Sequence, residues 1–402
     1  MRMKTRTAWY SVLHMLVDGV CAMAMIGRFV PRADGHLLVL LYNFCAFALQ
    51  MPIGALSDLL SVRTRRAAAL TAAAGVLCTI AGALTHPIVL GLGNALFHVG
   101  GGVGTIEEDR ERQWKGRGLG VFVAPGALGL YLGTLLAEKP SVWAWLWGAG
   151  LLMLLLCAGM LYGQMCGNSA VQNRQQEIIA APAGCAAGTR ACGWGTIGSA
   201  VCCFVVVVLR SYIGMAAAFP WKTTLAAGLL SVLAIVGGKM AGGFCGARYG
   251  YRRTAAISLL AAAVCWLFSG VQPAGILALF LFNMTMPITL YLMICGFPQM
   301  SGFAFGCLTF ALFLGFLPEY FGIAPFNGGM AALNDGMAPS GGVAALNDGM
   351  APSGGMVSGA MLESTVLPSL GSVLSLGLLL AAMGGGHEPL AQEGGCRGRI
   401  PD

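Results

Sequence analysis

Charged side chains are scarce in this sequence. Asp, Glu, Lys and Arg make up 10% of the 402 residues, whereas hydrophobic residues make up 57%. Soluble domains carry about 25% charged residues, so this shortage excludes an ordinary soluble protein. Apolar runs long enough to cross a bilayer recur from one end of the chain to the other. Together these features predict an all-α, polytopic membrane protein.

The sequence also lacks the patterns that mark catalytic, metal and nucleotide sites. Its 14 cysteines form no CxxC pair and no His/Cys spacing that suits zinc. The glycine-rich run at 101–104 is followed by no Lys-Ser or Lys-Thr pair, so it is not a phosphate loop. No span shows a nucleophile beside a base. We therefore expect a protein that is not an enzyme and that uses no metal, ATP or other cofactor.

Twelve apolar segments have the length of a membrane span, and they predict a chain that crosses the bilayer twelve times. The candidate spans are residues 9–29, 37–60, 67–85, 88–104, 118–137, 141–163, 196–219, 223–246, 254–271, 274–296, 300–317 and 357–383.

Basic residues fall mainly on one side of these spans. With the N-terminus inside, 17 of the 23 Lys and Arg residues lie on the cytoplasmic side. Because basic residues resist translocation, both termini are predicted to be cytoplasmic, in a plasma or bacterial inner membrane. The same bias accounts for the net charge of +7 and gives no reason to expect a nucleic-acid partner. We expect a monomer surrounded by lipid.

The longest polar connection, residues 164–195, follows the sixth span and is predicted to be a cytoplasmic loop. It separates an N-terminal six-helix bundle, residues 1–163, from a C-terminal one, residues 196–402. A tandem repeat, GGMAALNDGMAPS followed at once by GGVAALNDGMAPS, fills 328–353 in the outer loop before the last span. Its Gly, Asn, Asp and Pro residues favour turns. A duplication in a tolerant loop accounts for it better than a calcium or partner site.

One charge cluster occurs in both halves of the chain. The stretch GALSDLLSVRTRR follows the second span, and GFCGARYGYRR follows the eighth, which is the equivalent place in the second half. Gly54 of the first copy matches Gly243, whereas Asp58 matches Ala247. Such a repeat is common in secondary transporters, although the basic residues also suit a simple positive-inside anchor. The arginines are Arg63, Arg65 and Arg66 in the first copy and Arg248, Arg252 and Arg253 in the second.

Few polar groups lie within the spans, and ionisable ones are functional candidates because they cost a few kcal/mol in lipid. His14 and Asp18 lie four residues apart, on one helical face, where they can share a proton. A buried pair with a purely structural role is the alternative. The other polar groups within the spans are Asn94 and His98, again four residues apart, with Arg210 and Asn283. Lys239 and Glu363 lie nearer the ends of their spans, where we expect their side chains to snorkel toward the membrane surface.

These features resemble the major facilitator superfamily, whose loop between the second and third helices carries the pattern G-x-L-A-D-R-x-G-R-R. Gly54, Leu56, Asp58 and the arginines that follow fit that pattern. The stretches LHMLVDG, GLGNALFHVGGG and VVLRSYIG are most similar to the fosmidomycin-resistance group of drug exporters. The resemblance implies two pseudo-symmetric six-helix bundles around a central cavity, lined by the first, fourth, seventh and tenth spans.

The resemblance also implies roles for these residues. Asp18 would carry the proton, tuned by His14 or His98. Arg210 would contact an anionic substrate or form the counter-charge that Asp18 must release, and Asn94 and Asn283 would face the cavity. In the loop, Asp58 would act as a conformational latch by pairing with arginines on a neighbouring helix while the inner gate is closed.

We therefore predict a secondary active transporter that exports a small drug-like or anionic compound in a proton-coupled cycle. Proton symport for nutrient uptake is the second possibility. A transport-inactive sensor or assembly protein is the third, and the departures from the family pattern at Ser61 and Thr134 favour it. The costly charges retained within the spans argue against a protein that has lost transport.

Overall fold

The computed structural model describes residues 6–60, 65–166, 194–321 and 357–384, and every regular element in these ranges is a helix. Arg63, most of the predicted central loop and the tandem repeat at 328–353 lie outside the described residues. Eleven of the helices are long and apolar enough to cross a membrane. A shorter one, α12, occupies the place of the predicted ninth span. The all-α, polytopic fold predicted from the sequence is confirmed.

The first six spans are built from the following elements: α1 (Arg6–Ala24) with the π-helix η1 (Met25–Phe29), α2 (Gly35–Asn43) with η2 (Phe44–Ala48) and α3 (Gln50–Leu59), α4 (Arg65–Leu84), α5 (Pro87–Glu111), α6 (Arg117–Val123) with α7 (Pro125–Ala137), and α8 (Val142–Cys166).

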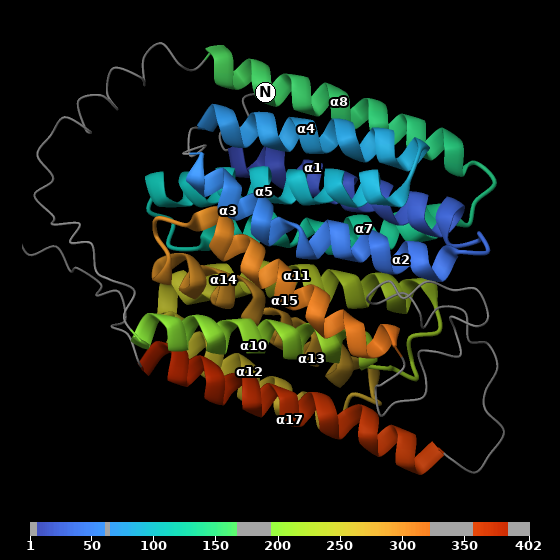
Figure 1. Ribbon diagram of the computed structural model, residues 1–402. Coiled ribbons are helices and arrows are strands. Elements are labelled where there is room, and N and C mark those ends of the chain that lie inside the picture. Colours follow the sequence, from blue (N-terminus) through green and yellow to red (C-terminus); the bar gives the residue numbers. More distant parts are fainter. Residues whose placement is uncertain (1–5, 61–64, 167–193, 322–356, 385–402) are drawn as a thin grey trace, which may run out of the picture.

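The last six spans are built from α10 (Trp194–Ala216), α11 (Leu225–Tyr249), α12 (Tyr251–Leu267), α13 (Gln272–Asn283) with α14 (Thr285–Gly296), α15 (Ser301–Tyr320) and α17 (Val357–Gly384). Figure 1 shows the two sets as two blocks of helices, with α1 to α8 in the upper part and α10 to α17 in the lower part.

Proline breaks the fifth span where it passes the first. Pro125 has no N–H group, so the carbonyl of Val121 loses its partner within the helix, and α6 ends at Val123. The hydroxyl of Ser11 on α1 donates to that carbonyl at 3.2 Å. A polar group left unpaired in lipid is costly, so this bond fixes α1 against the break.

Glycines bring the two halves into backbone contact at the predicted cytoplasmic ends. On α3 and α15, a Cβ atom at Gly54 would collide with the carbonyl of Gly302, and a Cβ atom at Gly302 with the carbonyl of Gly54. On α6 and α11, a Cβ atom at Gly120 would lie 2.9 Å from the carbonyl oxygen of Lys239, and a Cβ atom at Gly243 would lie 2.9 Å from that of Gly116. Small residues let helices pack this closely, so the two halves touch at both places.

Candidate functional site

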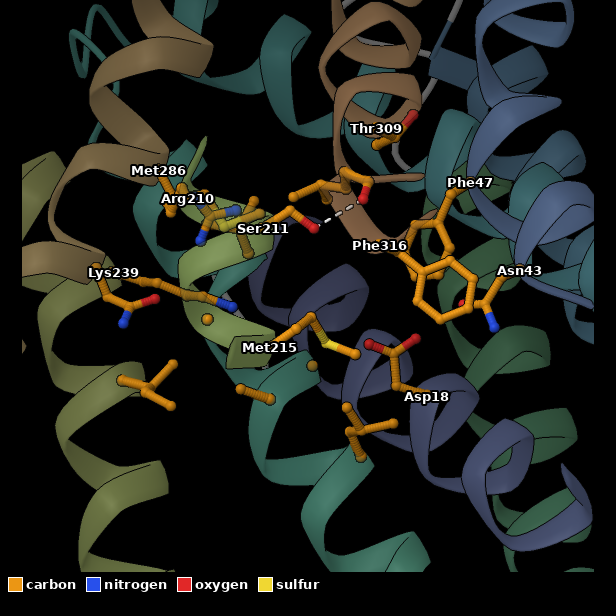
Figure 2. Close-up of a pocket in the computed structure, with 18 of the residues that line it drawn as sticks. Asp18, Asn43, Phe47, Arg210, Ser211, Met215, Lys239, Met286, Thr309 and Phe316 are labelled. Atoms are coloured by element: carbon orange, nitrogen blue, oxygen red, sulfur yellow. Dashed lines mark hydrogen bonds between the residues drawn. The ribbon is translucent and has the colours of Figure 1, made fainter. Parts of the chain in front are cut away.

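A cavity of about 370 Å³ lies between the two halves. Its wall includes side chains from both blocks of helices, and the close-up in Figure 2 shows several of them pointing into the space between α1 and α11. The structure places all six predicted cavity residues on this wall: His14, Asp18, Asn94, His98, Arg210 and Asn283.

Asp18 lies in a compact polar cluster on the N-terminal side of the cavity. His14 Nε2 is 3.1 Å from Asp18 Oδ2, and His98 Nε2 is 3.7 Å from Asp18 Oδ1. Asn94 Nδ2 donates to Asp18 Oδ1 at 3.1 Å. The two pairs found in the sequence, on the first and fourth spans, therefore meet in one cluster.

The hydrogen bonds of the two histidines define their tautomers. His14 Nδ1 lies 2.7 Å from the carbonyl of Phe122, and His98 Nδ1 lies 2.9 Å from the carbonyl of Asn94. Because a carbonyl only accepts, each Nδ1 carries the hydrogen. The two Nε2 atoms are 2.9 Å apart, a distance at which two bare lone pairs would repel. The arrangement can therefore hold one further proton between the imidazoles, with Asp18 as counter-charge.

The break in the fifth span positions this cluster. The carbonyl that binds His14 Nδ1 belongs to Phe122, in the last turn of α6 before Pro125. Gly126 follows in the first turn of α7, and a Cβ atom there would collide with both Asp18 and His14. A larger residue here would displace these two side chains, so glycine at position 126 leaves the space that the cluster occupies.

Two cations face the cluster from the C-terminal side. Arg210 on α10 and Lys239 on α11 line the cavity, and Figure 2 shows them opposite Asp18. Arg210 Nε is buried and has no hydrogen-bond partner among the described residues. No ion pair of either cation occurs in that part of the chain, including the pairing of Arg210 with Asp18 considered above. A charge without a partner on a mostly apolar cavity wall is costly, so these cations are available to an anion.

The snorkelling predicted for Lys239 is wrong. The helix α11 continues to Tyr249, about 15 Å beyond Lys239 at the usual rise per residue, so the side chain cannot reach the predicted cytoplasmic interface. Glu363 lies in α17, but its side chain is outside the described part of the structure.

Other cavity residues were missed by the sequence analysis. Lys222 falls in the short connection between the predicted spans 196–219 and 223–246, yet it is buried and lines the cavity, and burial lowers the pKa of its ammonium to about 8. Gln50 also lines the cavity, and Gln50 Oε1 and Asn94 Oδ1 are buried acceptors with no partner among the described residues. No pattern in the sequence marked Lys222, because a lysine in a short loop usually faces water.

The rest of the wall is mostly apolar and mixes aromatic with aliphatic and methionine side chains. It includes Phe47, Met215, Trp266, Met286 and Phe316. Figure 2 shows Phe47 and Phe316 near Asp18, and Met215 near the middle of the view. Such a lining suits a compound with an apolar body and a few polar groups.

The predicted latch residue Asp58 bridges the two halves, but through a different partner from the one expected. Its Oδ1 accepts from the backbone N–H of Gly302 at 3.1 Å, and its Oδ2 accepts from that of Phe303 at 2.8 Å. These are unpaired amides in the first turn of α15, where the helix dipole also favours a carboxylate. Among the described residues Asp58 therefore caps a helix of the other half, and the expected pairing with arginines is not seen.

The arginines of the two loop copies lie at the same end of the molecule. Arg248 stacks on Tyr249, 5.5 Å from the ring centre, and Arg66, Arg252 and Arg253 are exposed. Arg65 begins α4, although its side chain lies outside the described structure. Exposed positions at helix ends agree with the anchor role that the sequence left open.

The second copy of the loop lacks the latch. Ala247 stands where Asp58 stands in the first copy, and the amides at the start of α6 are capped from within their own half. Asp109 accepts from Gly116 N at 2.7 Å and from Gly118 N at 2.8 Å. Among the described residues, the carboxylate bridge between the halves is therefore present at α15 and absent at α6.

The halves also touch at the opposite, predicted outer end of the cavity. The ring of Tyr320 on α15 stacks on His36, with 4.3 Å between ring centres and 2.8 Å between the hydroxyl and Nδ1. Tyr131 on α7 donates to the carbonyl of Leu225 on α11 at 3.0 Å. The cavity thus lies between two sets of contacts that join the halves.

Removing the Asp58 carboxylate should loosen the contact between α3 and α15. Hydrogen bonds to a charged group contribute about 1.5–3 kcal/mol, so we expect Asp58→Asn to speed amide exchange in the first turn of α15 by roughly tenfold or more. Hydrogen exchange with mass spectrometry on the purified chain measures this. Asp34→Asn, at an exposed carboxylate paired with Arg32, is the control and should leave α15 unchanged. Equal protection in wild type and Asp58→Asn would contradict the latch.

Comparison with solved structures defines the fold. Over 94% of this chain, the fucose:proton symporter FucP of E. coli matches with a TM-score of 0.55 and 12% identity, covering 98% of that chain. The human organic anion transporter MFSD10 (TETRAN) matches over 94% of this chain and all of its own, with a TM-score of 0.56 and 15% identity. Both are transporters, not enzymes, of the major facilitator superfamily, and this chain has the fold of that superfamily.

The sequence by itself identifies no relative. No family model matches it, and no curated protein matches it. Because so few residues are identical, the likeness to the two transporters extends to the fold alone. The resemblance to the fosmidomycin-resistance group stays a prediction.

Proposed function

We propose that this protein is a secondary active transporter that couples the movement of a small organic anion to that of a proton. The observation that carries the proposal is the division of charge across the cavity. Arg210 and Lys239, which line the cavity without an ion-pair partner among the described residues, face the cluster formed by Asp18, His14 and His98. The fold supports it as well, since both solved neighbours are described as transporters.

The two cations account for the charge of the substrate. In an apolar wall, a guanidinium and an ammonium without partners attract a carboxylate or similar group strongly. Phe47, Phe316 and Trp266 would pack against the apolar body of such a compound. An organic anion therefore matches both kinds of surface, in line with the organic anion transporter that shares the fold.

The same geometry links the anion to the proton. A proton added between His14 and His98 makes the cavity more positive and so strengthens the binding of an anion. By linkage, the anion strengthens the binding of the proton by the same factor. The two ligands are therefore expected to bind together, which favours co-transport in one direction over the proton-driven export predicted from the sequence.

Export of a drug-like compound is the second candidate, and the aromatic and methionine side chains of the wall favour it. In that cycle the compound would bind by apolar contact and leave as the proton binds. The contacts at the two ends of the cavity serve either direction, because they would open in alternation. The Asp58 bridge would hold the cytoplasmic end closed.

Pairs of ligands that have the same shape but differ in charge test whether the cavity selects anions. We expect aromatic carboxylates to raise the unfolding temperature of the purified protein by about 2 to 4 °C at saturating concentration, because a ligand that binds only the folded state stabilises it. The matching uncharged amides should have little effect. Equal shifts for carboxylates and amides would contradict an anion site, and a preference for amines would reverse its sign.

A further inference from the structure

Three metal-ligating atoms meet on the wall of the cavity. A nitrogen of His14, a nitrogen of His98 and a carboxylate oxygen of Asp18 all lie within 4.8 Å of one another. The separations are 2.9 Å between the two Nε2 atoms, 3.1 Å from His14 to Asp18 Oδ2 and 3.7 Å from His98 to Asp18 Oδ1. Ligands of a tetrahedral zinc ion lie about 2.0–2.2 Å from the metal, and hence about 3.3–3.6 Å from each other. Asp18 thus offers Oδ2 to His14 and Oδ1 to His98, and the three separations lie on both sides of this range.

The hydrogen bonds that His14, His98 and Asp18 make to their neighbours are of the kind found around metal-binding residues. A metal-bound histidine usually donates its second ring N–H to a carbonyl or carboxylate, which orients the ring. Here Nδ1 of His14 and Nδ1 of His98 both bond backbone carbonyls, so both Nε2 lone pairs face inward. The side-chain amide of Asn94 donates a hydrogen bond to the carboxylate of Asp18 and so orients it. Simple packing of two histidines would not require both Nε2 atoms to face one another.

We propose that His14, His98 and Asp18 bind one divalent transition-metal ion of the zinc, cobalt or nickel class in place of the proton between the imidazoles. Imidazole and carboxylate ligands suit these ions. Three protein ligands leave a fourth position, and all three residues line the cavity. The fourth ligand therefore comes from the cavity, as a water molecule or an anion.

The ion and the proton exclude each other because both need the inward lone pairs. An ion of charge +2 with one carboxylate leaves the site with a net positive charge, opposite Arg210 and Lys239. Like the proton, the ion thus favours an anion as its neighbour. Metal binding itself requires neither transport nor an organic anion, so it can be tested apart from the proposed function.

Cobalt titration of the purified full-length chain, after removal of any affinity tag, tests the site. Co²⁺ bound to nitrogen and oxygen ligands in a tetrahedron absorbs strongly in the visible range, and Zn²⁺ displaces it. We expect one Co²⁺ per chain in the wild type. His14→Gln and His98→Gln should each weaken binding roughly 100-fold or more, since loss of an outer-shell partner alone costs about 10–100-fold.

His86→Gln is the matched control. His86 is exposed, lies at the start of α5 and accepts a hydrogen bond from Ile88 N, away from the cavity. It should bind Co²⁺ as the wild type does. Asp18→Asn is a third ligand variant, and a single symmetric peak in size-exclusion chromatography establishes that each variant is folded. A wild type without a visible cobalt band, or histidine variants that bind as tightly as the wild type, would overturn the proposal.

Discussion

Replacement of Asp18 by asparagine is expected to abolish proton movement coupled to an anion while leaving the anion site in place. Asparagine cannot serve as the counter-charge of a proton shared by His14 and His98, which lie 3.1 and 3.7 Å from the carboxylate. Removing one partner of a buried ion pair costs about 3–5 kcal/mol, so proton affinity should fall by roughly 100-fold or more. Proteoliposomes with a pH-sensitive dye inside measure the loss.

Asp34→Asn is the matched control for that experiment. Asp34 lies in an exposed turn and pairs with Arg32 at 3.4 Å, outside the cavity. It should transport as the wild type does, and both variants should still bind the anion. Coupled proton movement of normal size in Asp18→Asn would move the proton site away from this cluster.

Neutralising either cation of the cavity should have the second large effect. In Arg210→Gln or Lys239→Gln, the anion loses a charged partner in an apolar surrounding, which costs about 2 kcal/mol or more, or roughly 30-fold in affinity. Binding of the uncharged amide of the same shape should change little. Isothermal titration with the carboxylate and its amide measures both.

The unfolding temperature of each ligand-free variant shows whether the substitution has disturbed the fold. Because each cation lines a mostly apolar cavity and has no ion-pair partner among the described residues, its removal relieves an unfavourable charge. We therefore expect the ligand-free variants to unfold at a temperature equal to or above that of the wild type. Arg32→Gln, at an exposed site, is the control for a lost positive charge. Unchanged carboxylate affinity in both cavity variants would contradict the anion site.

The fold and much of the cavity wall could be predicted because polar groups are costly in lipid. Apolar length marked the spans, and the cost of burial singled out His14, Asp18, His98 and Arg210. The sequence did not predict that the two pairs on the first and fourth spans join in one cluster. That contact depends on the packing of α1, α5 and α6, and on the hydrogen bond between His14 Nδ1 and the carbonyl of Phe122, which no spacing within one helix encodes.

Two misses have a common physical cause. Lys239 was assigned to a span end because hydropathy placed that end at residue 246, whereas the helix continues to Tyr249. Asp58 was expected to pair with arginines because charged side chains are the partners that a sequence reveals. Its observed partners are instead the backbone amides of Gly302 and Phe303. Helix length and backbone partners are set by tertiary structure, so local patterns identified the residues but not their contacts.

A gradient of the anion itself tests proton coupling most directly. Wild-type protein in liposomes, with a pH-sensitive dye inside and equal pH on both sides, is exposed to an inward gradient of the aromatic carboxylate that binds most tightly. We expect acidification of the interior, because proton and anion cross together. Alkalinisation would indicate exchange and favour the exporter. No pH change, with the carboxylate nevertheless accumulating inside, would contradict proton coupling.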